Sequence, residues 1–147
     1  MTLTARRLAA AAVLVTAACG RGTAGTAPQP GVSSATISQI YAWRAKPGKF
    51  DEYTRYIRDV AAPIDHEAQR TGAFLSVTTY AVNDTTVPWT HLRVFLLRDS
   101  AQLRGLSDAL TAAGIRLQPD SVKRRLQGEY SASLRDRVSS SVAQIVR

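Results

Sequence analysis

The sequence predicts an α+β fold of the ferredoxin-like type, an antiparallel sheet with helices on one face. Three stretches alternate apolar and polar residues, as strands do, and the stretches between them repeat apolar residues every three or four positions, as helices do. Together with the C-terminal segment, these elements follow the order β-α-β-β-α-α-β, which is the ferredoxin-like order with one extra helix. We assign this single domain to residues 36–147.

The first half of the domain predicts a strand followed by two helical pieces. Residues 36–45, TISQIYAWRA, alternate and are rich in β-branched and aromatic side chains, which favours a strand. A KPGK turn follows, and Pro63, which cannot donate a backbone hydrogen bond, is expected to end or kink the next helix. A short helical piece over 64–71 is then closed by Gly72. The apolar face of the first helix comprises Phe50, Tyr53, Ile57 and Val60.

Two further helices are predicted in the second half of the domain. Asp99 or Ser100 caps a helix over about 101–113, which is expected to end at Gly114. Another helical stretch starts at Pro119. We expect its buried positions to be Val122, Leu126 and Leu134.

The remaining strands of the predicted sheet lie at 73–82, at 88–98 and at the C-terminus. A short NDTT break separates the first two and favours an antiparallel hairpin. The last segment, VSSSVAQIVR over 138–147, is ambiguous, because its apolar residues fit helical spacing whereas three consecutive serines are poor helix interior. Its β-branched end favours a strand, and a helix stays the alternative.

A resemblance to a known family rests on residues 40–53, IYAWRAKPGKFDEY. A strand with aromatic and Arg residues, a KPGK turn and an amphipathic helix that opens on an aromatic residue resemble the start of NIPSNAP-type and related dimeric α+β barrel domains. The order of elements agrees through about residue 113, while 115–137 departs from the simple pattern. The resemblance implies a homodimer in which two sheets face each other and form a barrel.

Alternation along the strands sorts their side chains into an aromatic, polar face and an aliphatic face. We expect the aliphatic face, with residues such as Ile40, Leu92 and Val94, to pack against the helices. The other face would expose a large apolar patch, so we expect the same sheet of a second copy to cover it. The aromatic, polar face comprises Gln39, Tyr41 and Trp43, then Phe74, Ser76, Thr78 and Tyr80, then Trp89, His91, Arg93, Phe95 and Leu97.

The aromatic, polar face is also the predicted ligand site, because aromatic walls with a few polar groups are typical of small-molecule pockets. Its predicted ligand-binding residues are Tyr41, Trp43, Tyr80, His91 and Arg93. Two functions fit: a binding or scaffold module without turnover, or an enzyme in which His91 is a general base and Arg93 holds an anion. The second resembles cofactor-free monooxygenases of the dimeric barrel group. No catalytic residue is assigned, and neither function requires a cofactor.

Other chemistries lack the residues that they need. Asp65, His66 and Glu67 are adjacent, so on a helix they spread around the axis instead of converging on one metal ion, and we interpret them as a solvated helix end. The basic cluster VKRRLQ has no aromatic interleaving, so we expect no nucleic-acid partner. The glycines of GRGTAG follow no strand and open no helix, as a phosphate loop would require. The sequence therefore predicts no metal site, no nucleic-acid partner and no phosphate loop.

Residues 1–18 predict an export signal. Two arginines precede an unbroken apolar run that ends in small residues directly before Cys19, the single cysteine. This arrangement resembles the lipobox of bacterial lipoproteins, which implies that Cys19 is acylated and anchors the protein to a membrane of the cell envelope. In the alternative, an ordinary signal peptidase cuts near Ala18 or Ala24, and the protein is secreted or periplasmic. Residues 19–35, rich in Gly, Pro, Ser, Thr and Ala, predict a flexible tether.

The chain is basic. Without Arg6 and Arg7 of the export signal it carries 17 Lys and Arg against 11 Asp and Glu, a net charge of +6. These charges are scattered along the sequence, which is compatible with a role in keeping the protein soluble and nothing more. In the alternative, they attract the domain to a membrane surface with anionic lipid heads.

Overall fold

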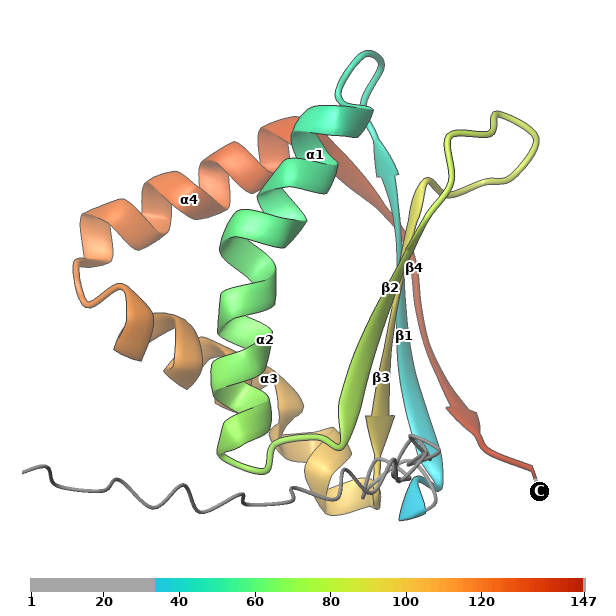
Figure 1. Cartoon of the computed structure of the whole chain (residues 1–147), viewed down its shortest axis with the longest axis vertical. Coiled ribbons are helices and arrows are strands. Elements are labelled where there is room, and N and C mark those ends of the chain that lie inside the picture. The colour runs from blue at the N-terminus through green and yellow to red at the C-terminus, as the bar shows by residue number, and fades with distance from the viewer. Residues whose placement is uncertain (1–33, 147) are drawn as a thin grey trace, which may run out of the picture.

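The computed structural model describes residues 34–146, which form a four-stranded antiparallel sheet with helices packed on one side (Figure 1). The spatial order of the strands is β2-β3-β1-β4. The predicted α+β fold class is therefore confirmed. The strands are β1 (Ile37–Ala45), β2 (Ser76–Ala81), β3 (His91–Leu97) and β4 (Arg135–Gln144). The helices are α1 (Phe50–Tyr56), α2 (Ala62–Arg70), α3 (Ser100–Leu117) and α4 (Ser121–Leu134). Among the helices of residues 34–146, none combines the length and the apolar character needed to cross a membrane.

A π-helical turn, η2 (Ile57–Ala61), joins α1 to α2 without a break in the helix. Pro63 lies in the first turn of α2 and cannot donate to the carbonyl of Asp59, four residues earlier. The wider π-helical turn accommodates the missing hydrogen bond, because its bonds span five residues: the backbone N–H of Ala62 donates to the carbonyl of Ile57. Pro63 thus marks a change of helix type, while α2 does end as predicted, just before Gly72 with its positive φ of 81°.

Both α3 and α4 have an aspartate as their N-cap residue. The carboxylate of Asp99 accepts hydrogen bonds from the backbone N–H groups of Ala101 and Gln102, which makes Asp99 the N-cap of α3. In the same way Asp120 caps α4, by accepting from the two backbone N–H groups at Val122 and Lys123. Local capping chemistry therefore fixes where α3 and α4 begin.

The predicted end of α3 at Gly114 is wrong, because the helix continues to Leu117. Gly114 packs against α2, where a Cβ would lie 3.8 Å from Cδ1 of Ile64, an ordinary contact distance. The approach of the two helices therefore does not require a glycine, and Gly114 lacks the positive φ with which a glycine ends a helix, so α3 ends only ahead of Pro119. In α4, burial is confirmed for Leu134 and wrong for Val122 and Leu126, which are 54% and 52% exposed.

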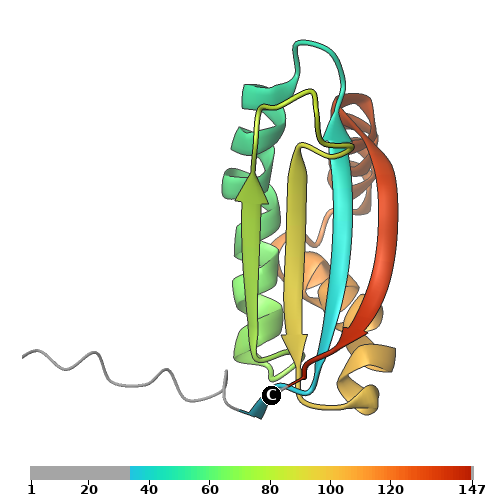
Figure 2. The ribbon, with the colours of Figure 1, turned by 90° about the vertical axis from the view of Figure 1, so that its right-hand side faces the viewer.

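The ambiguous C-terminal segment is a strand. β4 begins at Arg135 and pairs antiparallel with β1, with an irregularity between Ala42 and Trp43. Figure 2 shows β4 along the outer edge of β1. That edge offers backbone partners along most of the segment, which outweighs the helical spacing of its apolar residues.

The prediction of which sheet face meets the helices is wrong. The aromatic face packs against the helices: Phe95 and Leu97 of β3 form a core cluster with Phe74, with Ala68 of α2 and with Leu106 of α3. Long aromatic side chains fill the space between the two layers and bury the largest area there. The aliphatic face is the open one, and no helix of residues 34–146 covers it (Figure 2). Its apolar members include Ile40, Ala42, Leu92, Val94, Leu96 and Tyr80, and the strand register also places Ser76 and Thr78 on it, opposite to their predicted face.

Candidate ligand-binding site

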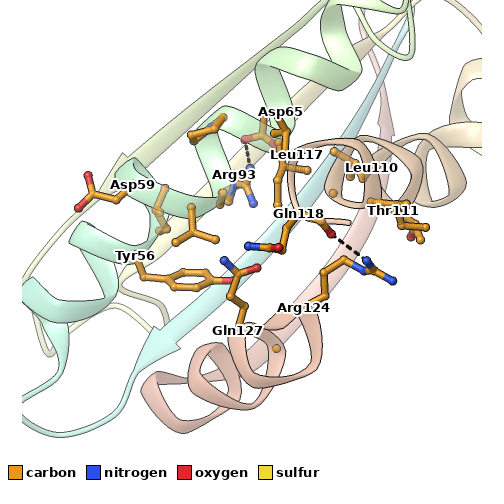
Figure 3. A pocket seen from close by; sticks show the side chains of 18 of the residues that line it. Tyr56, Asp59, Asp65, Arg93, Leu110, Thr111, Leu117, Gln118, Arg124 and Gln127 are labelled. Atoms are coloured by element: carbon orange, nitrogen blue, oxygen red, sulfur yellow. Dashed lines mark hydrogen bonds and ion pairs between the residues drawn. The ribbon is translucent and has the colours of Figure 1, made fainter. Parts of the chain in front are cut away.

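A cavity of about 600 Å³ lies between the helices and the sheet (Figure 3). The run from α1 to α2 forms one wall, α3 and α4 form another, and Arg93 of β3 with Arg135 of β4 provides the sheet side. The walls are largely aliphatic. The aliphatic lining comprises Ile57, Val60, Ile64, Leu110, Ile115 and Leu117.

An ion pair crosses from the sheet to α2 at this cavity. Nη2 of Arg93 donates to Oδ2 of Asp65, and both side chains are largely buried, at 14% and 6% exposed. Burial raises the pKa of Asp65, and the neighbouring Arg93 opposes that shift. The Nε atom of Arg93 is buried and has no hydrogen-bond partner within residues 34–146. In Figure 3 the guanidinium points from the sheet into the cavity.

Arg135 is a second guanidinium at the cavity, held by aromatic rings. Its Cζ lies 3.4 Å from the centroid of the Trp43 ring and 5.3 Å from that of Tyr53, and its Nε donates to the hydroxyl of Ser131 at 3.1 Å. Burial lowers the pKa of Arg135 below the ordinary arginine value. Over the part of the chain that the structure describes, Arg135 forms no ion pair with a carboxylate.

Polar side chains from three helical segments converge on the middle of the cavity. Figure 3 shows Tyr56, Gln118 and Gln127 pointing toward one another beneath Arg93. Arg124 holds the start of α4 in place, since its Nη1 donates to the carbonyl of Gln118 at 2.8 Å and to the following carbonyl at 2.6 Å. The cavity is therefore apolar around its circumference and polar at its centre, the composition expected of a small-molecule site.

His91 lies outside this cavity, fully buried under α1. Its Nε2 is 2.9 Å from the hydroxyl of Thr54, which itself donates to the carbonyl of Phe50, so the proton is assigned to Nε2. The hydroxyl of Thr90 lies 2.9 Å from Nδ1. Burial, reinforced by Arg135, lowers the pKa of His91 to about 4. At neutral pH His91 is an uncharged core residue with both ring nitrogens occupied.

The structure divides the five predicted ligand-binding residues. Only Arg93 lines the cavity. Tyr41, Trp43 and His91 share its sheet face but do not line the cavity, although Trp43 supports Arg135. Tyr80 pairs with Leu92 on the open face and is 54% exposed, because the chain leaves regular alternation between Phe74 and the start of β2.

Sequence reasoning missed four charged residues of the cavity: Asp59, Asp65, Arg124 and Arg135. Asp65 was expected at a solvated helix end, yet it is 4% exposed and paired, while its neighbours His66 and Glu67 fit that expectation better. Arg135 carries no local signal, since its role depends on β4 bringing it over Trp43. Within residues 34–146 there is no cluster of three or more His, Cys, Asp or Glu side chains that could hold a metal ion.

The export signal at 1–18, Cys19 and most of the tether at 19–35 lie outside the described residues. Ala35, the last residue assigned to the tether, is 1% exposed. The folded part of the chain therefore already includes this residue.

Comparison with known proteins identifies the fold. The sequence matches no protein-family model and no curated protein sequence. The crystal structure of HapK from Hahella chejuensis superposes with a TM-score of 0.52 at 10% identity, covering 75% of this chain and 92% of that one. The chain has the fold of the dimeric α+β barrel proteins. PA3566 from Pseudomonas aeruginosa is similar at a TM-score of 0.45 and 18% identity, covering 77% and 94% of the two chains.

Proposed function

We propose that this protein is a binding module without turnover, which holds a small molecule with an apolar or aromatic body in the cavity between sheet and helices. The observation that carries the proposal is the cavity itself: about 600 Å³, with aliphatic walls and a few polar groups at its centre. The module is exported, anchored at Cys19 and paired with a second copy.

The open face of the sheet supports the homodimer. Ile40, Leu92 and Val94 lie side by side across β1 and β3, and each is partly exposed. Tyr80 extends this apolar surface onto β2. A two-fold axis would bring the same surface of a second copy against it and remove the patch from water. The barrel would then close through the aliphatic face.

Export and anchoring are supported by the sequence alone. Residues 1–18 have the composition of a bacterial signal, and small residues stand directly before Cys19. A single lipid chain holds a protein only weakly on a membrane, and a basic surface that attracts anionic lipids strengthens the attachment. The excess of Lys and Arg in this chain would provide that basic surface.

Binding without turnover is favoured over the enzymatic alternative by the state of His91. A general base must reach a proton of the bound molecule and have a pKa near the working pH. His91 is fully buried outside the cavity, and its pKa is lowered to about 4.

Two glycines provide a matched test of the cavity. A Cβ would meet no atom within 4 Å at Gly128, which lines the cavity, nor at Gly105, which does not. Gly128→Leu should fill part of the cavity and weaken binding of 1-decanol at least about 10-fold, while Gly105→Leu leaves it unchanged. Both changes favour their helices, so stability should fall in neither.

Native mass spectrometry of the full-length protein tests both the pairing with a second copy and the binding of a small molecule. We expect a dimer that carries the mass of a small molecule, and a Gly128→Leu variant that loses this mass. A monomer would contradict the pairing through the open face. A protein that carries no extra mass and binds neither 1-decanol nor decanoate at about 0.1 mM would contradict the binding function.

A further inference from the structure

We infer that the ligand is an organic acid: an apolar body held by the aliphatic walls, with one carboxylate bound at Arg93. This inference rests on the proposed binding function and adds the chemical class of the ligand. It follows from the charges around the cavity, from their burial and from the polar groups beside them.

The cavity has a surplus of positive charge. Among residues 34–146, its lining contains three guanidinium groups, on Arg93, Arg124 and Arg135, against two carboxylates, on Asp59 and Asp65. The Asp59 carboxylate is 53% exposed and forms an ion pair with a residue outside the lining. Asp65 is therefore the carboxylate that remains in the cavity to balance the guanidinium groups, and it already forms an ion pair with Arg93.

This surplus lies where water compensates it poorly. The Arg93 side chain is 14% exposed, and its Cζ lies 5.2 Å from the ring of Phe95. Arg135 is stacked on Trp43, and burial lowers its pKa. Charges removed from water are costly unless they are paired, so a carboxylate entering the cavity gains more here than at the surface.

Hydrogen-bond donors for a carboxylate line the same cavity as Arg93. The side-chain amides of Gln118 and Gln127 point into the cavity (Figure 3) and have no hydrogen-bond partner in the part of the chain that is described. Amides serve neutral and charged ligands alike, whereas guanidinium groups favour the carboxylate. The aliphatic walls then accommodate the remainder of the acid.

Decanoate and 1-decanol test the inference, because they share an alkyl body and differ in charge. Titration calorimetry on the full-length protein at neutral pH should show decanoate binding at least about 10-fold more tightly. Equal affinity would overturn the acid class and leave the binding function standing. Binding of neither compound at about 0.1 mM would overturn both.

Replacement of the buried ion pair links the preference to this site. In the double variant Arg93→Met with Asp65→Asn, no single buried charge is left behind, so the fold is retained. This change removes one charge of each sign, so Arg124 and Arg135 still favour an anion, and we expect the preference for decanoate to fall by at least about threefold, with 1-decanol still bound. Arg104→Met removes an exposed charge of α3 outside the cavity and should keep the preference. A double variant that still prefers decanoate as the wild type does would overturn the inference.

Discussion

The two faces of the sheet differ in what covers them and in what they do. The face toward the helices carries the aromatic residues, the buried His91 and the cavity with Arg93. The open face carries aliphatic residues such as Val94, which remain partly exposed. The larger side chains thus form the core and the site together, whereas the smaller ones form the open face.

The largest expected effect is a difference in stability between variants at two neighbouring residues of β3, Phe95 and Val94. Phe95 is 1% exposed and lies in edge-to-face contact with Phe74 and Tyr41, at centroid distances of 5.1 and 5.9 Å. Phe95→Ala should lower the free energy of unfolding by about 4 kcal/mol, and Val94→Ala by about 1 kcal/mol. Urea denaturation of both variants measures the difference. Equal losses would mean that the two faces are equally buried.

An acid-dependent loss of stability is expected next, from His91 on the helix-covered face. The unfolded chain takes up a proton near pH 6.5, while the folded chain resists protonation down to about pH 4. The free energy of unfolding should therefore decrease as the pH falls through this window, by up to about 3 kcal/mol. Denaturation at several pH values should show this slope in the wild type.

Two histidine variants assign that slope. His91→Gln cannot titrate and should lose it, although the variant is less stable throughout. His66→Gln changes an exposed residue and should keep it. A slope that survives in His91→Gln would show that other groups cause it.

A smaller effect is expected on the open face, where a charge should act on pairing and leave the fold intact. Val94→Lys would bring two ammonium groups into the proposed interface and should weaken the dimer at least about 100-fold. Because the side chain can reach water in the monomer, the circular dichroism spectrum should not change. Sedimentation equilibrium measures the dissociation constant. A dimer of unchanged affinity would exclude this face as the interface.

Local signals allowed much of the fold to be predicted. Alternation identified β1 and β3 because side-chain direction in a strand depends only on the chain itself. The carboxylate of Asp99 caps α3 through contacts within three residues, and Gly72 follows α2 with a positive φ. These features need no distant partner.

The candidate site was only partly predictable. Arg93 was found because it stands among aromatic residues on a strand, but the pocket was expected on a face shared with a second copy. Asp65 looked like a solvated helix residue, since nothing nearby in the sequence indicates that Arg93, 28 residues later, will pair with it. His91 seemed available for chemistry until Thr54 and Thr90 occupied both of its ring nitrogens.

Periodicity, capping and turn residues were enough to predict the order of the elements, the α+β class and the start of each helix to within about two residues, whereas β2, β3 and β4 each start about three residues away from the predicted position. Packing in three dimensions decided which face of the sheet meets the helices, that α3 passes through Gly114, and that Arg135 lines the same cavity as Arg93. The physical reason is that burial and charge pairing are properties of the space between elements. That space exists only after helices and sheet have packed together.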